Sequence, residues 1–386
     1  MKRKIVFEVD NVMPSLSAVV SVVNAKNVSP ILDCVLIQTN KENEGDGSLA
    51  MRLIASDSEV WLKGYAYVDG ESDKNVSICV DAKTITQTLS NLGGEEITMY
   101  IDDTKKTVEC KYGTGRFSIP YQDSDVFPMP ILNREERKRV ELAERVFCNA
   151  IGRVKYAMGN EKVYIIFNTI HMEFTQNGLL SVATDKRIIA EYKDNAYSSE
   201  EDMEITIPKK ASSILSNILE PKSEGNVVIT YTENNAMIQS EKFCLTTSLL
   251  TYRYPEFREA TPSRNMVTAE VLIDKNAMMQ ALKRMSPVIS SSDLIEFSFE
   301  RNNMKMQSDD SNLNRSTSED VPCEYDGNLF RICLSCGCVT SILNSLGTDT
   351  IKMSFTSSRK PCFFEEVGNE VKTEYMALLM PMMKMS

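Results

Sequence analysis

The sequence has very little of the side chains on which most enzyme chemistry depends. Histidine occurs once, as His171, and tryptophan occurs once, as Trp61, among 386 residues. Catalytic triads, histidine metal sites and proton relays need imidazoles in company with other groups, so a single histidine disfavours most of them. We therefore expect no catalytic site, no metal site and no cofactor.

Long hydrophobic runs are also missing. The longest uncharged apolar stretch, residues 12–25, is interrupted by Pro14, and it is shorter than the roughly 20 residues that cross a bilayer. The first ten residues contain only Ile5, Val6 and Phe7 as an apolar run, so they lack the core of a signal peptide. We expect no membrane partner and a cytoplasmic location.

An excess of basic residues is missing as well. The 43 Lys and Arg against 54 Asp and Glu give a net charge of −11. This balance argues against a uniformly basic surface that coats nucleic acid, but it leaves room for a local basic stripe. With 42% hydrophobic residues the chain has the composition of a soluble globular protein. Its ten cysteines, without a secretory signal, are expected to be reduced thiols.

What the sequence does contain is a threefold internal repeat. A helix-like segment recurs at residues 89–92, 215–218 and 343–346, and a strand-like run follows each copy. An apolar strand that runs into a small-Asp turn precedes them, ending at Asp57, Asp185 and Asp309. The repeat predicts three domains, residues 1–130, 131–262 and 263–386, with linkers at residues 133–139 and 261–264.

Each copy predicts two amphipathic helices among several strands. The first helices are predicted at residues 15–25, 144–158 and 275–285, and the second ones begin near Ala82 and Ala211. Alternating strands joined by short turns favour antiparallel sheets with helices on one face, which is an α+β fold. Helix before strand in both halves of a copy suggests a further twofold repeat inside each domain.

Basic side chains gather on the helix faces opposite the apolar stripes. They are Lys26, Lys83, Arg153, Lys155, Lys209, Lys210, Lys283 and Arg284. Lysine and arginine decorate many solvated helix faces, and this remains the alternative interpretation. Recurrence in three copies favours a shared role instead. Without a pattern for reading bases, such faces would contact phosphates independently of sequence.

Five further motifs lie in order along this repeat: Ser29-Pro-Ile-Leu32, Val182-Ala-Thr-Asp185, Ile207-Pro-Lys-Lys210, Tyr252-Arg-Tyr-Pro-Glu-Phe-Arg258 and Leu378-Leu-Met-Pro-Met382. With them the chain resembles the bacterial sliding clamp, the β subunit of the replicative DNA polymerase holoenzyme. No motif is specific alone, but their order and spacing are, and together they span nearly the whole chain. The resemblance implies three tandem clamp domains with antiparallel sheets outside and paired helices inside.

The resemblance also implies a DNA polymerase processivity factor. Two half rings would close head to tail as a homodimer around duplex DNA, and the ring would slide because it is held topologically and not by tight contacts. Closure would pair an edge strand of domain one with domain three of the second chain. By position, the contact residues would be Phe117 and Ile119 in domain one, and Val288 and Ile289 in domain three.

A second implied function is to hold clients, which are the replicative polymerase, the clamp loader and other proteins. They would bind through short peptides of glutamine and apolar residues in a pocket between domains two and three. Carried over by position, its lining is Phe167, Thr184, Lys186, Arg187, Ile188, Ile189, Pro255, Glu259, Ala260, Leu378, Leu379, Met380, Pro381, Met382 and Met383. The sequence departs from the family pattern at residues 186–189, at Glu259 and at the extra residues 384–386.

Other features favour structural interpretations. Cys333, Cys336 and Cys338 have the spacing of a metal knuckle, but they lie at a predicted strand-to-helix junction and are expected to be buried thiols. The Asp-containing turns are expected to be turn formers and not metal ligands. His171 is predicted to face solvent or a sheet edge, and Trp61 to pack in the first domain.

Two other classes of function stay open. One is a clamp-like scaffold that binds peptides without encircling DNA, which the acidic net charge and the altered pocket suggest. The other is a carboxylate hydrolase acting on nucleic acids or glycosides.

Overall fold

The computed structural model describes residues 3–43, 49–69, 72–130, 137–262, 266–289, 292–310, 314–368 and 372–383. Parts of both predicted linkers, residues 133–136 and 263–264, and the final residues 384–386 lie outside the described residues. The chain forms two compact units, Met1–Arg145 with Ser213–Thr251, and Val146–Ser212 with Tyr252–Ser386. The central third of the chain therefore contributes one part to each unit.

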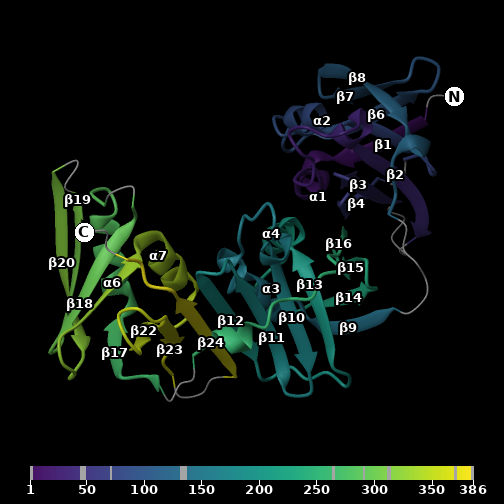
Figure 1. Cartoon of the computed structure of the whole chain (residues 1–386). Helices are drawn as coiled ribbons and strands as arrows, with labels where there is room; N and C mark the ends of the chain where they lie inside the picture. Colours follow the sequence, from purple (N-terminus) through teal and green to yellow (C-terminus); the bar gives the residue numbers. More distant parts are fainter. Residues whose placement is uncertain are drawn as a thin grey trace. The chain divides into compact units, whose positions relative to one another are not determined.

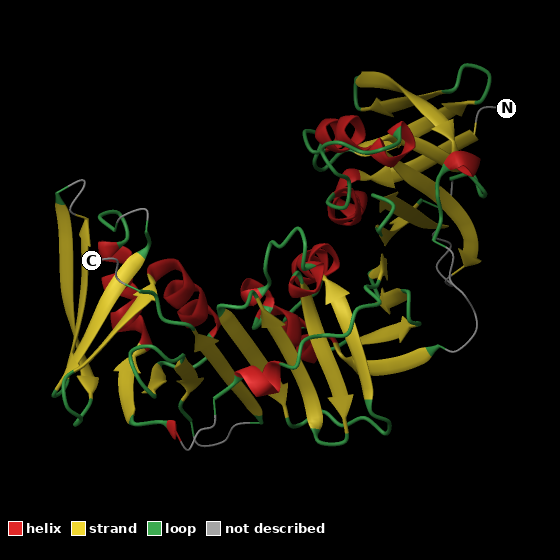
Figure 2. Ribbon diagram, viewed as in Figure 1, coloured by secondary structure: helices red, strands yellow, loops and turns green. Residues whose placement is uncertain are grey.

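One βαβββ unit occurs six times within the described residues (Figure 2). The first third contains β1 (Arg3–Glu8), α1 (Val9–Val20), β2 (Cys34–Asn43), β3 (Leu49–Ser56), β4 (Val60–Val68), β5 (Ser77–Asp81), α2 (Ala82–Leu89), β6 (Glu96–Asp102), β7 (Thr107–Tyr112) and β8 (Gly115–Asp123). The second third contains β9 (Lys138–Ala143), α3 (Glu144–Gly152), β10 (Thr169–Thr175), β11 (Gly178–Thr184), β12 (Ile188–Asp194), β13 (Met203–Pro208), α4 (Lys209–Ile218), β14 (Asn226–Tyr231), β15 (Asn235–Gln239) and β16 (Phe243–Ser248).

The last third follows the same order. It contains β17 (Ala269–Asp274), α6 (Lys275–Met285), β18 (Leu294–Glu300), β19 (Asn303–Asp310), β20 (Arg315–Glu324), β21 (Phe330–Ser335), α7 (Cys336–Ser345), β22 (Thr350–Phe355), β23 (Cys362–Glu366) and β24 (Thr373–Leu379). Short helical turns lie between these elements: η1 (Pro30–Asp33), η2 (Ser124–Val126), η3 (Lys155–Ala157), η4 (Ile165–Phe167) and α5 (Phe257–Ala260). The α+β class and the twofold repeat inside each third are both confirmed.

The two βαβββ units of each third exchange their first strands. β1 lies antiparallel to β6, and β5 lies antiparallel to β2. The same exchange pairs β9 with β14 and β13 with β10, and then β17 with β22 and β21 with β18. Each third therefore contains two four-stranded antiparallel sheets, and each exchanged strand leads directly into the helix that follows it.

The outer strands of these sheets join one third to the next. β16 pairs with β4, with Leu245 opposite Leu62, and β12 pairs with β24, with Ala190 opposite Ala377 (Figure 1). On their outer sides β8 and β20 pair only briefly, with three residues of β5 and two residues of β17. Residues 115–120 of β8 and 315–322 of β20 pair with no further strand in the described part of the chain.

The helix predicted at residues 275–285 is confirmed as α6. Its start is fixed by Asp274, whose Oδ1 accepts a hydrogen bond from the Ala277 N–H at 2.7 Å. Asp81 caps α2 in the same way, through the Thr84 N–H at 2.7 Å. Each cap places the first turn of its helix directly after the strand that precedes it.

Two predicted helices are corrected. α1 spans Val9–Val20 and not residues 15–25, and Pro14 lies inside it. The buried stripe with helical spacing begins before Pro14 and includes Val12 and Leu16. α3 ends at Gly152, and the remainder of the predicted helix forms the separate turn η3.

An apolar group in the first unit, here called the Phe127 cluster, lies around the start of β2. Its buried residues are Ile31, Leu32, Cys34, Leu36, Ile54, Cys79 and Phe127. Trp61 packs against it, and the indole Nε1 donates to the Pro128 carbonyl at 2.8 Å. The predicted packing of Trp61 in the first domain is confirmed.

Candidate client-binding site and DNA-facing residues

The second unit contains a related group, here called the Tyr254 cluster, beside the pairing of β12 with β24. Its buried residues are Val182, Ile189, Tyr254, Phe257, Phe363 and Leu378. Ile189 and Leu378, both predicted to line the client pocket, lie opposite each other in register. Thr184, Ile188 and Leu379 are buried as well. These five residues, predicted to line the pocket, are buried and do not form an exposed lining.

The terminal segment, residues 380–383, is fixed by backbone hydrogen bonds at both ends. The Met380 N–H donates to the Arg187 carbonyl at 2.8 Å, and the Met382 N–H donates to the Cys333 carbonyl at 2.8 Å. Pro381 and Met382 are half-buried, whereas Met380 and Met383 are exposed, Met383 by 80%. Flexible methionine side chains thus reach solvent next to the β11–β12 turn.

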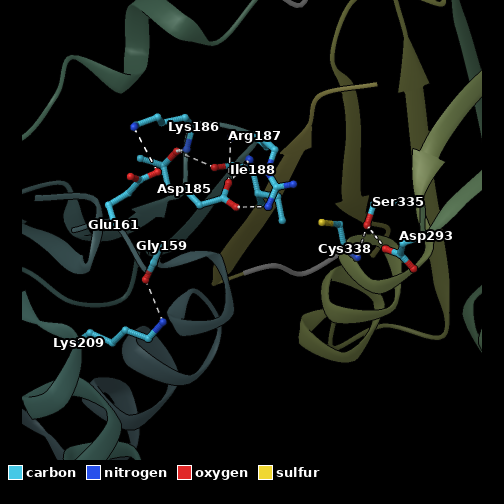
Figure 3. A network of polar contacts seen from close by, with 11 residues as sticks. Gly159, Glu161, Asp185, Lys186, Arg187, Ile188, Lys209, Asp293, Ser335 and Cys338 are labelled. Atoms are coloured by element: carbon cyan, nitrogen blue, oxygen red, sulfur yellow. Dashed lines mark hydrogen bonds and ion pairs between the residues drawn. The ribbon is translucent and has the colours of Figure 1, made fainter. Parts of the chain in front are cut away.

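That turn is built around Asp185, as Figure 3 shows. The Asp185 Oδ1 accepts hydrogen bonds from the N–H groups of Arg187 at 2.9 Å and Ile188 at 2.8 Å, while Lys186 has a φ of 78°. Asp57 builds the β3–β4 turn identically, with acceptor distances of 3.0 and 2.8 Å and a φ of 81° at Ser58. Both predicted turn-forming aspartates are confirmed.

The third copy of this motif differs from the prediction. Asp309 lies within β19, where its Oδ2 accepts a hydrogen bond from Gln307 Nε2 at 3.0 Å. Residues 311–313, which follow β19, lie outside the described residues. The strand continues past the aspartate because β19 and β20 stay in register as far as Asp310 opposite Arg315.

Lys186 connects this turn to η4. Its Nζ lies 3.3 Å from Glu161 Oε1, and 4.5 and 4.8 Å from the ring centres of Tyr164 and Phe167. Figure 3 shows the Lys186 and Glu161 side chains reaching toward each other. A lysine over aromatic faces gains cation–π attraction. Phe167 is half-buried, as its predicted pocket role requires, and Arg187 is exposed and pairs with Asp185 at 3.3 Å.

Sequence reasoning missed the exposed apolar residues just before Phe167. Val163, Tyr164 and Ile165 are exposed, Tyr164 by 59%. The available signal was five consecutive apolar residues, 163–167, that fit neither a helical stripe nor strand alternation. Exposed large apolar residues grouped in this way are typical of interaction surfaces.

The segment at residues 254–260 also differs from the prediction in detail. Pro255 is half-buried, and Glu259 and Ala260 are exposed on α5. The buried anchors are instead Tyr254 and Phe257, whose rings meet edge to face at 6.3 Å. The predicted lining does not include Tyr254 or Phe257, although both belong to the 252–258 motif.

His171 is buried, so its predicted exposure is wrong. Only 5% of the residue is exposed, and its ring stacks on Tyr254 with centres 4.7 Å apart and planes 10° apart. The Glu173 carboxylate lies 3.4 Å from His171 Nε2 and accepts two hydrogen bonds from Arg258, at 3.0 and 2.6 Å. Hydrogen bonding to His171, and then to Arg258, lowers the pKa of Glu173 to about 2.

The basic residues predicted to face DNA fall into two groups. Lys26, Lys83, Lys155 and Lys283 are exposed, and Lys210 is half-buried. Lys83 projects from α2 and Lys283 from the last turn of α6, on the faces opposite their buried stripes. Lys26 follows α1 in a loop. These lysines keep their predicted role as a proposal.

Three other basic residues are engaged within the protein. Arg153 Nη1 lies 2.5 Å from both Glu366 Oε1 and the Ser345 carbonyl, and its guanidinium is within 6 Å of the Tyr192 and Tyr375 ring centres. Lys209 Nζ donates to the Gly159 carbonyl at 2.9 Å (Figure 3). It also donates to Asn160 Oδ1 at 2.8 Å.

The third is Arg284, which forms two hydrogen bonds to Glu319, at 2.9 and 2.7 Å. The prediction that Arg153 is a free phosphate contact is therefore corrected, because Glu366 neutralises its charge in a mostly buried position. Arg284 pairs with Glu319, and Lys209 bonds to Gly159 and Asn160, so both keep their predicted DNA contact as a proposal only.

The residues predicted at the dimer contact lie beside the two open strand edges. Phe117 and Ile119 are on β8, half-buried and buried respectively, within the stretch that has no outer strand partner in the described residues. Val288 and Ile289 are half-buried in the turn after α6, the helix that packs against β20. A cavity of about 460 Å³ adjoins the β8 edge, lined by residues that include Arg116 and Phe117.

All ten cysteines are free thiols. Cys336 is buried and begins α7 directly after β21, at the predicted junction, but Cys333 and Cys338 are only half-buried, so the prediction that all three are buried is corrected. Burial raises the pKa of the Cys34 and Cys323 thiols to about 11, which disfavours thiolate chemistry. Among the described residues, no group of three His, Cys, Asp or Glu could hold a metal ion, and no helix is long and apolar enough to span a membrane.

Comparison with known proteins agrees with this architecture. Family profiles described as the N-terminal, central and C-terminal domains of the DNA polymerase III beta subunit match residues 3–131, 141–256 and 262–383. The beta sliding clamp of Haemophilus influenzae is 24% identical over 97% of this chain and 98% of its own length, and that of Vibrio cholerae is 22% identical over 95% and 97%.

Solved structures show the same fold. A Pseudomonas aeruginosa sliding clamp bound to griselimycin superposes with a TM-score of 0.88, at 20% identity and with full coverage of both chains. A Bacillus subtilis DNA polymerase sliding clamp gives 0.87, at 18% identity and again with full coverage of both chains. With three family profiles in tandem along nearly its whole length, the chain belongs to the DNA polymerase III beta subunit family, the bacterial sliding clamps.

Proposed function

We propose that two copies of this chain close head to tail into a ring that encircles duplex DNA and tethers DNA polymerase III to its template. The supporting observation is which strands have no partner along their outer side. Of the six strands that end a βαβββ unit, β4 pairs with β16 and β12 pairs with β24, which leaves β8 and β20 open over most of their length among the described residues. Pairing β8 of one chain with β20 of another satisfies both edges under twofold symmetry.

The DNA contacts of this ring would be weak and independent of sequence. Among the predicted contacts, Lys26, Lys83, Lys155 and Lys283 are exposed residues and Lys210 is half-buried. A closed ring stays on DNA without tight binding, so a few mobile phosphate contacts suffice. The three-domain division at residues 1–130, 131–262 and 263–386 is part of this proposal, as is a cytoplasmic location.

Clients would bind at the exposed apolar surface above the Tyr254 cluster. Tyr164, Ile165, Met380 and Met383 offer apolar side chains there, and Lys186 and Arg187 offer positive charge. A glutamine-containing apolar peptide from the polymerase or the clamp loader fits this combination of flexible methionines and aromatic faces. The chain would act as an accessory subunit without a catalytic site of its own.

The clamp-like scaffold keeps one specific observation in its favour. Internal carboxylates neutralise two of the eight predicted phosphate contacts, Arg153 and Arg284, and the net charge is −11. A scaffold would use the client site without enclosing DNA.

Retention on circular DNA separates the two functions. The protein is loaded onto nicked circular plasmid by its clamp loader, and gel filtration follows the fraction bound before and after the plasmid is cut once. A ring stays on the circle and runs off the linear form. Equal loss from both forms would favour the scaffold. The variant Lys83→Glu with Lys283→Glu should reduce loading and leave peptide binding unchanged.

A further inference from the structure

Two of the six strands that end a βαβββ unit contain a proline. They are β8, with Pro120, and β20, with Pro322, which are also the two strands with an open outer edge. The sequences of β4, β12, β16 and β24, whose outer sides are paired, contain no proline. Proline cannot donate to a strand ladder, so it fits where a ladder ends. The two prolines therefore mark limits of the open edges.

Each proline directly precedes the residues that are paired on the outer side of its strand. β5 pairs with β8 at Tyr121 and beyond, and β17 pairs with β20 at Cys323 and beyond. The Tyr121 N–H donates toward β7, to the Lys106 carbonyl at 3.0 Å, and the Cys323 N–H donates toward β19, to the Asn302 carbonyl at 3.3 Å. Because backbone groups alternate sides along a strand, the even-numbered residues of β8 and β20 face outward.

A residue that presents both its N–H and its carbonyl to the outer side can form a complete hydrogen-bonded pair with another strand. The prolines present only a carbonyl. On the open edges the complete residues are Arg116 and Ser118 on β8, and Ser316, Ser318 and Asp320 on β20. Two antiparallel registers join them in two complete pairs. In one register Arg116 lies opposite Asp320, and in the other it lies opposite Ser318.

Charge distinguishes these two registers, because opposite charges that lie directly opposite each other stabilise a strand pair. The Arg116 side chain is 77% exposed, and its Nη1 lies 3.5 Å from Glu109 Oε1, a surface ion pair of small worth. Asp320 accepts a hydrogen bond from the neutral Asn303 amide at 2.9 Å, and Lys305 lies opposite it on β19. Arg116 and Asp320 stand on the edge strands themselves, whereas Glu109 and Lys305 stand one strand further in.

The faces of the two strands agree with this pairing. The odd-numbered residues of both edges turn toward the protein: Phe117, Thr317 and Glu319 are half-buried, and Ile119 is buried. Residues directly opposite each other share a face of the sheet, so both registers keep these side chains together. The cavity of about 460 Å³ beside β8 is lined in part by Arg116 and Phe117, which leaves room for side chains of a second chain.

We propose that ring closure uses one register, in which Arg116 of one chain lies opposite Asp320 of the other. Ser118 then lies opposite Ser318, and a proline ends the ladder on either side. The proposal rests on the proposed ring. Pairing β8 with β8 would bring two Arg116 side chains together, and pairing β20 with β20 would bring two Asp320 side chains together. The charge pair therefore selects head-to-tail closure as well as the register.

Charge reversal tests the pair, with sedimentation velocity of the full chain as the readout. Arg116→Asp alone and Asp320→Arg alone place like charges opposite each other at both contacts of a dimer, so each should weaken dimerisation about 100-fold. An equal mixture of the two variants should dimerise as the unsubstituted protein does, because both contacts of the mixed ring join opposite charges. Restoration also shows that both variants fold. Glu324→Arg, on the same strand but paired with β17, should leave dimerisation unchanged.

Disulfide trapping tests the register. A chain with Ser118→Cys and Ser318→Cys should form a covalent dimer under mild oxidation, because the Cα atoms of opposite residues lie about 5.5 Å apart, within reach of a disulfide. The combination of Ser118→Cys with Ser316→Cys belongs to the other register and should stay mostly monomeric on a non-reducing gel. The unsubstituted protein, with its ten thiols, is the control.

The outcomes separate the register from the ring. Charge variants that dimerise as tightly as the unsubstituted protein, a mixture that stays monomeric, or a cross-link through Ser316→Cys alone would each overturn the register and leave ring closure standing. An unsubstituted protein that is monomeric at every concentration contradicts the ring, and the register with it. We expect a restored dimer in the mixture and a cross-link through Ser318→Cys.

Discussion

The Phe127 cluster and the Tyr254 cluster lie at equivalent places of the repeat, but the residues next to them differ in exposure. In the first, η1 contributes Ile31 and Leu32, both buried, and Trp61 covers the group. In the second, η4 leaves Tyr164 and Ile165 exposed, and the terminal methionines lie beside the Asp185 turn. At equivalent positions of the repeat, the second copy has Tyr164 and Ile165 where the first copy has Ser29 and Pro30. The repeat sets the shared fold, and a few substitutions decide in which copy this region is buried and in which copy it exposes large apolar side chains.

The largest effect is expected from Phe127→Ala. Removing a buried aromatic ring leaves a cavity, so the free energy of unfolding should fall by about 4 kcal/mol. Urea denaturation followed by Trp61 fluorescence measures this loss, because the indole packs on the same cluster. Peptide affinity should not change. A matching loss of peptide binding would mean that both clusters take part, which contradicts the comparison.

A second pair of substitutions distinguishes a loss of stability from a loss of peptide binding. Leu32 and Phe167 are equivalent, each lying two residues before the first strand that follows. Leu32→Ala should cost about 3 kcal/mol of unfolding free energy and leave peptide affinity intact. Phe167→Ala, at a half-buried position, should cost less stability and weaken peptide binding about tenfold. Calorimetric unfolding and anisotropy on both variants give the two readouts, and the same pattern in both variants would refute the distinction.

The two aspartate turns allow a smaller and closely matched test. Asp57→Ala and Asp185→Ala each remove two hydrogen bonds from backbone N–H groups to a carboxylate, so each should cost about 1 kcal/mol of stability. Only Asp185→Ala should also weaken peptide binding, because its turn positions Lys186 and Arg187. Equal peptide affinities of the two variants would show that the Asp185 turn does not contribute to the client site.

The smallest effect concerns the carboxylate found only in the second cluster. The pKa of Glu173 is lowered to about 2 in the folded protein, below the usual value of about 4.3. Its contribution to stability is therefore present above about pH 4.3 and is lost as pH falls toward 2. The difference in unfolding free energy between the protein and Glu173→Gln should narrow from pH 5 to pH 3 in urea titrations. A difference that is constant over this range contradicts the assigned ion pair.

Local signals in the sequence predicted a large part of this fold. The Asp274 cap and the apolar stripe after it define α6, and Asp57 and Asp185 form the turns that their spacing indicated. α1 was misplaced because Pro14 lies six positions into the helix, where a proline normally ends one.

The errors in the candidate site come from contacts between residues far apart in the chain. Arg153 is neutralised by Glu366, 213 residues away, and no spacing rule reveals such a pair. His171 was taken as exposed because the alternation of β10 does not show that Tyr254 covers its outer face. Charge and strand pattern could be read from the sequence, whereas the partner of each charge could not.

The central claim is ring closure through β8 and β20, and native mass across a dilution series tests it most directly. The chain has a mass of 43.5 kDa, so the account predicts a dimer of twice that mass that persists on dilution to nanomolar concentration. Phe117→Asp, at a half-buried position on the open edge of β8, should convert it to a monomer that still binds client peptide. A protein that is monomeric at every concentration would contradict the ring.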